Sequence, residues 1–290
     1  MTQKWRLQMN KIKIMINGIP GDMAVNLTKH TLVNDRFDLI SQSLTGPEIT
    51  KDEHLVDSIP IRLIHPDVRK QAITEIKKKE GSFISVDYTH PSAVNDNAEF
   101  YAKHGLPFVM GTTGGDRKRL EDTVCSFSIP AVIAPNMAKQ IVGFQAMIEY
   151  AANTFPDLFK GYSLEIKESH QKGKADTSGT AKAMAEYFNN IGVRFSKEDI
   201  KKERDPDVQK NVLGIPEKYL EGHGWHTYSL LSNDRTVSFE FSHNVNGRDV
   251  YAQGTLDAVS YLDIKVKEGE KGKVYSMIDV LKGVTTAGQI

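Results

Sequence analysis

Apolar runs of strand length alternate with amphipathic segments through the first 134 positions of the chain. Six runs of this kind are found at residues 11–17, 37–43, 61–64, 83–87, 107–110 and 131–134. Segments of helical periodicity lie between them, at residues 23–32, 67–79 and 92–103. Regular alternation of strand and helix is typical of a parallel sheet covered by helices. We therefore predict an α/β, doubly wound domain over residues 1–137.

The pattern changes after residue 137. A helical segment at residues 139–151 is followed by a strand at 162–167, a helix that begins near 178, and strands at 227–231, 237–243 and 250–256. Helices and strands no longer alternate one to one, so this part does not predict a second doubly wound sheet. We expect a smaller α+β domain with an open mixed sheet over residues 138–248.

Charge and composition restrict the partners of the chain. Lysine plus arginine and aspartate plus glutamate both number 37, and this balance argues against a broad nucleic-acid or anionic-membrane surface. No apolar run approaches the roughly 20 residues of a membrane helix, and residues 1–10 lack the apolar core of a signal peptide. We expect a soluble, cytoplasmic protein. The single Cys125 excludes an internal disulfide, and we interpret His223 and His226 as loop or packing residues and expect no metal.

A glycine turn separates the first strand from the first helix. The turn and the helix start read Gly18-Ile19-Pro20-Gly21-Asp22-Met23. Gly18 allows a tight turn, Gly21 lets a pyrophosphate approach the backbone, and the helix amino end attracts the phosphates. This context favours a Rossmann-like dinucleotide site that uses residues 18–23.

The end of the second strand bears on the choice of cofactor. An acidic residue there would bind the adenosine ribose and select NADH, whereas an arginine would bind the 2′-phosphate of NADPH. The residues at that end are Ser41, Ser43 and Thr45. We therefore expect NADPH with NADH possible, and Ser43 is the candidate contact.

Candidate chemistry is concentrated at residues 165–180. An imidazole (His170) and two ammonium groups (Lys172 and Lys174) precede a predicted helix start at Ser178-Gly179-Thr180. Free N–H groups and the positive end of the helix dipole attract anions at such a start. The segment predicts a site for a small dianionic substrate.

Several motifs in this order resemble those of the dihydrodipicolinate reductases. Residues 168–181, Glu-Ser-His-Gln-Lys-Gly-Lys-Ala-Asp-Thr-Ser-Gly-Thr-Ala, resemble the substrate signature of that family. Further motifs are similar to its nicotinamide-side contacts and to its exit from the nucleotide domain: Asp87-Tyr88-Thr89, Gly111-Thr112-Thr113 and Pro135-Asn136-Met137. Gln171 and residues 214–228 are similar to the plant-like branch.

The resemblance implies an NAD(P)H-dependent oxidoreductase of lysine and diaminopimelate biosynthesis that reduces dihydrodipicolinate, formed from 4-hydroxy-tetrahydrodipicolinate, to tetrahydrodipicolinate. It implies that His170 and Lys174 are catalytic and that the motifs above at residues 87–89, 111–113 and 135–137 bind the cofactor. The implied substrate contacts are Thr113, Gln171, Lys174, Ser178, Gly179 and Thr180. Roles for Lys172 and Arg248 stay open.

It further implies that residues 249–290 return to the first domain and that residues 138–248 mediate substrate binding and homo-oligomerisation, as a dimer or tetramer. A processed plant protein would lie in the plastid stroma. Two other readings remain: another two-domain NAD(P)-dependent dehydrogenase of an amino acid or semialdehyde, because this architecture hosts many reactions, or a non-catalytic NADPH-binding protein.

Overall fold

The computed structural model describes residues 11–287, with side chains as far as residue 283. The chain divides into two compact units. The first contains the residues up to Lys139 together with those from Tyr251 onward, and the second is Gln140–Val250. Each unit has a sheet and a hydrophobic core of its own.

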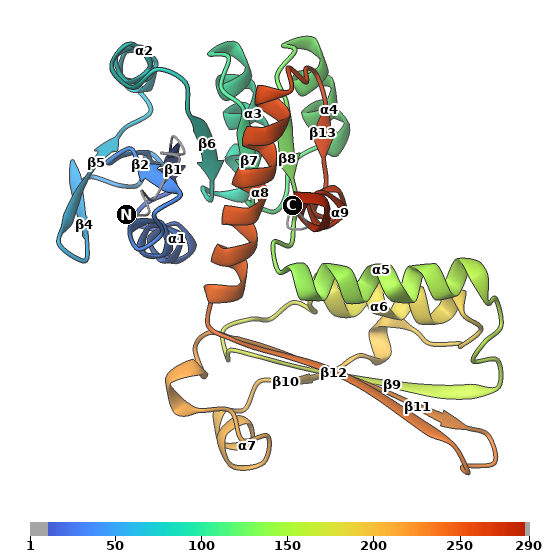
Figure 1. The fold of residues 1–290 in the computed structure, drawn as a ribbon. Coiled ribbons are helices and arrows are strands. Elements are labelled where there is room, and N and C mark those ends of the chain that lie inside the picture. The colour runs from blue at the N-terminus through green and yellow to red at the C-terminus, as the bar shows by residue number, and fades with distance from the viewer. Residues whose placement is uncertain (1–10, 288–290) are drawn as a thin grey trace, which may run out of the picture. The chain divides into compact units, whose positions relative to one another are not determined.

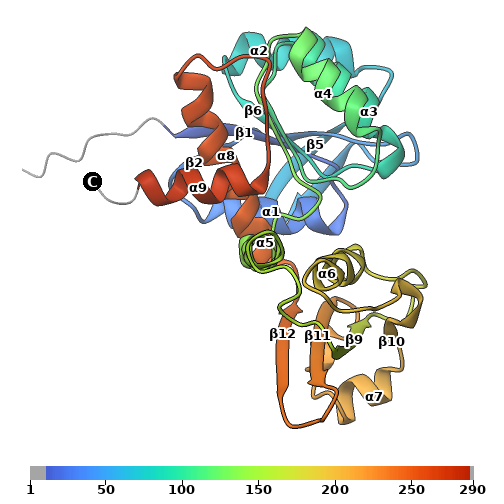
Figure 2. The ribbon, with the colours of Figure 1, turned by 90° about the vertical axis from the view of Figure 1, so that its right-hand side faces the viewer.

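The first unit is built on a six-stranded sheet in which all neighbouring strands are parallel. Its strands, in spatial order, are β13 (Val274–Tyr275), β8 (Ala131–Ile133), β7 (Phe108–Met110), β6 (Ile84–Asp87), β1 (Ile12–Asn17) and β2 (Phe37–Leu39). Its helices are α1 (Asp22–Leu32), α2 (Arg69–Glu80), α3 (Val94–Lys103), α4 (Arg117–Ser126), α8 (Asp249–Lys267) and α9 (Met277–Ala287). Figure 2 shows α2, α3 and α4 on one side of this sheet and α1, α8 and α9 on the other. The predicted doubly wound α/β class is confirmed.

The prediction of one continuous strand over residues 37–43 was wrong. The chain turns after β2, where Ile40 donates its N–H to Ile14, and it starts a new strand, β3 (Gln42–Leu44). β3 belongs to a separate three-stranded sheet with β5 (Ile59–Ile64) and β4 (Glu53–Val56). The predicted strand at 61–64 therefore also lies outside the main sheet. Asn17 at the end of β1 accepts the Leu44 N–H at 3.0 Å, so β3 docks at the end of β1 and not alongside it.

The second unit contains a four-stranded mixed sheet, as expected. Its strands, in spatial order, are β10 (Lys201–Glu203), β9 (Tyr162–His170), β11 (His223–Ser232) and β12 (Ser238–Asn246). β10 is parallel to β9, and the other pairs are antiparallel. Helices α5 (Lys139–Thr154) and α6 (Gly179–Asn190) lie over one face of the sheet, and the short α7 (Pro206–Asn211) lies on the other side (Figure 1). Phe188 and Tyr228, both 0% exposed, join α6 to the sheet in the core.

One further expectation about an element was wrong. The expected strand at residues 250–256 is the start of α8, whose buried residues include Ala252, Leu256 and Val259, at the spacing of one helix face. A window of seven residues was too short to separate that spacing from strand alternation. His223 and His226, expected as loop or packing residues, are buried within β11 and therefore fit the packing interpretation.

The start of the helix at residues 92–103 also differs from expectation. The side chain of His90 accepts the Ser92 N–H and caps a 3₁₀ turn (Pro91–Ala93) that precedes α3. Two further 3₁₀ turns, Lys197–Asp199 and Glu217–Tyr219, lie in the second unit. Within residues 11–287, the structure contains no helix that is both long and apolar enough to cross a membrane.

Candidate active site

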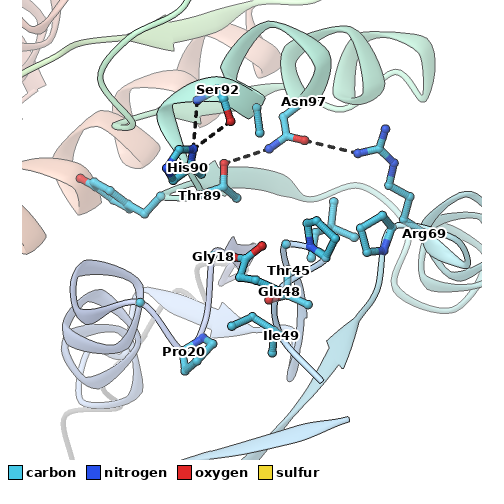
Figure 3. A pocket seen from close by; sticks show the side chains of 17 residues that line it. Gly18, Pro20, Thr45, Glu48, Ile49, Arg69, Thr89, His90, Ser92 and Asn97 are labelled. Atoms are coloured by element: carbon cyan, nitrogen blue, oxygen red, sulfur yellow. Dashed lines mark hydrogen bonds between the residues drawn. The ribbon is translucent and has the colours of Figure 1, made fainter. Parts of the chain in front are cut away.

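A cavity of about 720 Å³ lies at the carboxyl ends of β1 and β6 in the first unit (Figure 3). The strand order reverses between these two strands, and doubly wound sheets hold their ligands at such a point. Of the predicted cofactor residues, five line this cavity: Gly18, Pro20, Gly21, Tyr88 and Thr89.

Close backbone contacts require glycine at two positions of the turn. Gly18 has φ +105°, and a Cβ placed on it would lie 2.2 Å from the carbonyl oxygen of Tyr88. A Cβ on Gly21 would lie 2.8 Å from the carbonyl oxygen of Gly18. Helix α1 begins after Gly21, which has no side chain to cap the first turn. This arrangement fits a dinucleotide pyrophosphate at the amino end of α1.

Three predicted cofactor residues are buried and do not line the cavity: Ile19, Ser43 and Met137 are at most 2% exposed. The Ser43 hydroxyl accepts the Ile19 N–H at 3.2 Å and therefore stabilises the glycine turn. Asp22 and Met23 are the first residues of α1. Asn136 uses its side-chain oxygen to accept the Ala138 N–H at 2.9 Å, and Pro135 and Thr113 are exposed.

Asp87 is fully buried and binds two loops and helix α3. One carboxylate oxygen accepts the Thr89 N–H at 3.1 Å and the hydroxyls of Thr89 and Thr112 at 2.8 and 2.6 Å. The other accepts the Tyr101 hydroxyl at 2.6 Å and the Asn97 amide at 3.1 Å. Burial and the nearby Asp87 charge raise the pKa of Tyr101 far above its usual value, so the phenol remains a donor. Asp87 therefore shapes the cavity wall through its neighbours.

Tyr88 packs closely against the glycine of the next loop. Its hydroxyl pairs with that of Thr255 at 2.5 Å, and burial raises its pKa. A Cβ on Gly111 would lie 2.4 Å from the Tyr88 ring, so only glycine fits at this position.

Two charged residues of the cavity were missed from sequence. Glu48 lies in the loop after β3, and Arg69 is the first residue of α2 (Figure 3). Arg69 donates to the Asn97 side-chain oxygen at 3.4 Å and lies over the Phe100 ring at 4.7 Å. In the sequence, Glu48 lies just beyond the end of the predicted second strand, where an acidic residue would bind the adenosine ribose. That position was the signal that could have identified it.

In the second unit, His170 is the last residue of β9. Its Nδ1 lies 3.0 Å from the carbonyl oxygen of His223. A carbonyl only accepts, so Nδ1 carries a hydrogen and Nε2 is the nitrogen that gains and loses a proton. Nε2 has no hydrogen-bond partner within the described chain. Burial lowers the pKa of His170; the Glu168 carboxylate opposes that shift, and the cations Arg204 and Lys174 add to it.

Lys174 lies in the loop between β9 and α6. Its side chain is 23% exposed, and its ammonium pairs with the Asp176 carboxylate at 2.8 Å. The Lys174 N–H donates to the carbonyl of Gln171 at 3.0 Å, which closes a turn over Lys172 and Gly173. Lys172 is exposed, and Gln171 is half-buried.

The start of α6 matches the predicted cap. The Ser178 hydroxyl accepts the Thr180 N–H at 3.2 Å, and the N–H of Ser178 donates to the Glu168 carboxylate at 3.0 Å. Nothing lies within 4 Å of a Cβ placed on Gly179, so the helix start is open to a ligand there. The structure thus brings His170, Lys174 and the α6 start into one loop region of the second unit.

Histidines from β11 and β12 surround this region. His226 is 4% exposed, its Nε2 lies 3.1 Å from the Ser178 hydroxyl, and its ring stacks on that of His243 at 4.7 Å. Burial lowers the pKa of His223, takes that of His226 well below its usual value, and lowers that of His243 to about 4. These rings are therefore neutral near pH 7. His226 packs within the sheet and also contacts the candidate site.

Among the described residues, ligand atoms of Glu168, His170 and His226 lie within 4.8 Å of one another. Zinc ligands lie about 2.0–2.2 Å from the ion, so a tetrahedral set would be roughly 3.3–3.6 Å apart. The Arg204 guanidinium also already pairs with Glu168, at 2.5 Å. Spacing and charge favour a hydrogen-bonded cluster over a metal centre.

Comparisons with known proteins cover nearly the whole chain. The family model "Dihydrodipicolinate reductase, N-terminus" matches residues 12–137, and "Dihydrodipicolinate reductase, C-terminus" matches residues 141–281. The chain is 46% identical over 279 residues to the Arabidopsis thaliana protein "4-hydroxy-tetrahydrodipicolinate reductase 2, chloroplastic", an alignment that covers 94% of this chain and 78% of that protein. It is 44% identical over 269 residues to the Oryza sativa "Probable 4-hydroxy-tetrahydrodipicolinate reductase 1, chloroplastic", covering 93% and 78%.

Among solved structures, the fold resembles that of a dipicolinate-bound dihydrodipicolinate reductase from Paenisporosarcina sp. TG-14. The TM-score is 0.64 at 17% identity, over 92% of this chain and 97% of that chain. At this identity the likeness concerns the fold.

Proposed function

This chain belongs to the dihydrodipicolinate reductase family, and from that premise we infer that His170, Lys174 and the start of α6 form its substrate site. The enzyme is a 4-hydroxy-tetrahydrodipicolinate reductase of lysine and diaminopimelate biosynthesis that uses a nicotinamide cofactor. The observation that carries the site assignment is the loop that places a histidine with one reactive nitrogen next to Lys174 and the open amino end of α6.

The substrate is a small dicarboxylate. We propose that the Lys174 ammonium leaves Asp176 and binds one carboxylate at the start of α6, where the N–H groups of Ser178 and Thr180 must exchange their present partners, Glu168 and the Ser178 hydroxyl, for the ligand. The Asp176 carboxylate is 72% exposed, and an ion pair with such a group contributes little, so its exchange for a substrate carboxylate costs little. Thr113 and Gln171 remain proposed substrate contacts.

His170 is the proposed proton donor. The cofactor supplies a hydride to ring C4 of the substrate when bound, and the resulting enamine then needs a proton at C3. Nδ1–H is held by the His223 carbonyl, so protonated His170 delivers this proton from Nε2. Lys174 would stabilise the negative charge that develops during the reaction.

For the cofactor, we propose that Gly18 to Met23 bind the pyrophosphate and that the loop after β3 faces the adenosine ribose. The other residues suggested by the family motifs remain proposed nicotinamide-side contacts. Glu48 favours the ribose hydroxyls of NADH, whereas Arg69 offers a charge for the 2′-phosphate of NADPH. We expect both cofactors to bind, with a preference under about 2.7 kcal/mol, roughly hundredfold.

Calorimetric titration of NADPH and NADH tests this expectation. Glu48→Gln removes the carboxylate that repels a 2′-phosphate, so it should shift the preference several-fold toward NADPH. A preference above a hundredfold in the parent protein, or no shift in the variant, would contradict the proposed roles.

The activity itself is tested by following cofactor absorbance with the product of the coupled synthase as substrate. We expect turnover with NADPH and with NADH. Turnover of an amino acid or semialdehyde in its place, or cofactor binding without turnover, would support one of the two other classes considered above.

We propose a homo-oligomer, a dimer or tetramer, to be measured by light scattering of the purified protein. For its location we propose the cytoplasm, or the plastid stroma for a plant protein, which the chloroplastic relatives favour.

A further inference from the structure

Arg204 follows β10 and reaches into the candidate substrate site. Its side chain is 18% exposed, and its partner, the Glu168 carboxylate, is 0% exposed. Nη2 donates to one Glu168 oxygen at 2.5 Å, while the other Glu168 oxygen accepts the Ser178 N–H at 3.0 Å. One buried carboxylate therefore links Arg204 to the first turn of α6.

The rest of the guanidinium binds the loop that carries Lys174. Nε donates to the Lys174 carbonyl at 2.8 Å, and Nη2 also approaches the Asp176 carbonyl at 3.4 Å. Nη1 donates to the Glu203 carbonyl at the end of β10, at 2.8 Å. A planar fork with five N–H donors can make these bonds at once, and an ammonium group cannot.

We propose that Arg204 is a positioning residue that holds Lys174 and the start of α6 in the geometry that binds a dicarboxylate. It acts on Lys174 through the backbone carbonyl and on α6 through Glu168. This role rests on the proposed function of the loop, because a dicarboxylate is the ligand that the loop would bind. Arg204 makes four contacts within the protein, so its effect on the ligand would pass through these neighbours.

The same pair acts on His170 with opposite signs, because Glu168 favours its protonated form and Arg204 disfavours it. Loss of Arg204 should therefore raise the pKa of His170, and loss of the Glu168 charge should lower it. The groups that act on His170 from the elements around it are Glu168, Lys174, Arg204, His223, His226 and His243.

The test compares Arg204→Gln, Arg204→Lys and Glu168→Gln with the full-length parent protein. Lys201→Gln is the matched control, because Lys201 lies on β10 and makes an exposed pair with Glu165. In calorimetry with pyridine-2,6-dicarboxylate, Arg204→Gln should bind at least about tenfold more weakly than the parent protein. Arg204→Lys should recover part of this loss, and Lys201→Gln should bind with the parent affinity. NADPH affinity should stay unchanged in all of them.

Two measurements separate positioning from a general loss of structure. The pKa of His170, measured by NMR titration, should be higher in Arg204→Gln and lower in Glu168→Gln than in the parent protein. Shifts of this pKa in the same direction in both variants would overturn the proposal. Amide exchange of residues 172–178 without ligand should be faster in Arg204→Gln, and parent rates would also overturn it.

The exchange measurement needs no substrate, so it distinguishes a failure of this proposal from a failure of the proposed function. If Arg204→Gln does not fold, Arg204→Lys decides, because it keeps the charge that Glu168 requires but loses the fork. Parent affinity for the dicarboxylate and parent exchange rates in Arg204→Lys would overturn the proposal.

Discussion

The two nitrogens of the His170 ring have different partners. Nδ1–H is held by the carbonyl of His223, and Nε2 has no partner within the described residues. A ring held in this way has one tautomer when neutral, and only its protonated form can donate from Nε2. A backbone carbonyl 53 positions away therefore selects which ring nitrogen is available to donate a proton.

We expect the pH dependence of turnover to follow the protonation of this ring. Burial lowers the pKa of His170, so the protonated fraction in the free enzyme falls as pH rises through a value below 6.5. A bound dianion raises that pKa again and moves the fall in kcat to higher pH. His170→Gln keeps much of the side-chain volume but cannot deliver a proton, so we expect about a hundredfold lower kcat and a flat profile.

The measurement is kcat between about pH 6 and about pH 9, and pyridine-2,6-dicarboxylate affinity serves as a control for binding. If His170→Gln turned over at the parent rate across this range, His170 would have to be demoted from proton donor to substrate positioning.

Lys174 and Lys172 form a natural comparison, because they are two residues apart and differ in exposure. Lys174 is partly covered and held by Arg204, while Lys172 is exposed. Lys174→Ala should weaken the binding of pyridine-2,6-dicarboxylate roughly 10–100-fold, because a hydrogen bond to a charged group contributes about 1.5–3 kcal/mol. Lys172→Ala is expected to stay within a few-fold of the parent in the same titration. Equal losses in the two variants would assign the effect to net charge and not to a specific contact.

At the scale of elements, the carboxyl end of β6 depends on one buried carboxylate. Asp87 accepts five hydrogen bonds from the two loops and from α3. In Asp87→Asn, the amide donors would face other donors, so we expect about 1–3 kcal/mol less free energy of unfolding. Urea unfolding measures this change. Asp116→Asn is the control, because Asp116 is an exposed helix cap and asparagine caps a helix equally well. A loss below about 0.5 kcal/mol in Asp87→Asn would contradict the role of Asp87 as the organiser of these loops.

At the scale of the whole molecule, the proposed cofactor residues lie in the first unit, and the proposed substrate residues lie in the second unit except for Thr113. NADPH alone should therefore slow amide exchange at residues 18–23 and 45–49, while pyridine-2,6-dicarboxylate alone should slow exchange at residues 170–180. Each ligand stabilises the segments that it binds, by about 2.7 kcal/mol when it is present at a hundred times its Kd. Mass-spectrometric hydrogen exchange measures both effects on one sample. Protection by the dicarboxylate confined to residues 18–23 would contradict the division of roles.

Much of this protein follows from its sequence read locally. The glycine turn after β1, the Ser178 cap of α6 and most of the alternating strands and helices depend on backbone freedom, capping and periodicity within a few residues. The proposed catalytic groups also lie on one continuous segment, residues 168–180, so their motif is visible without a fold.

Contacts between distant residues could be decided only by the tertiary structure. The break between β2 and β3 arises because Asn17 binds the N–H of Leu44, 27 residues away, and α8 is distinguished from a strand by the core that it covers. Arg204 lies 36 residues from Glu168 and 30 from Lys174. In the sequence alone, Arg204 cannot be distinguished from an ordinary surface arginine. Hydrophobic periodicity records which face of an element is buried, but it does not record which distant polar group meets which, because that depends on the packing of the whole unit.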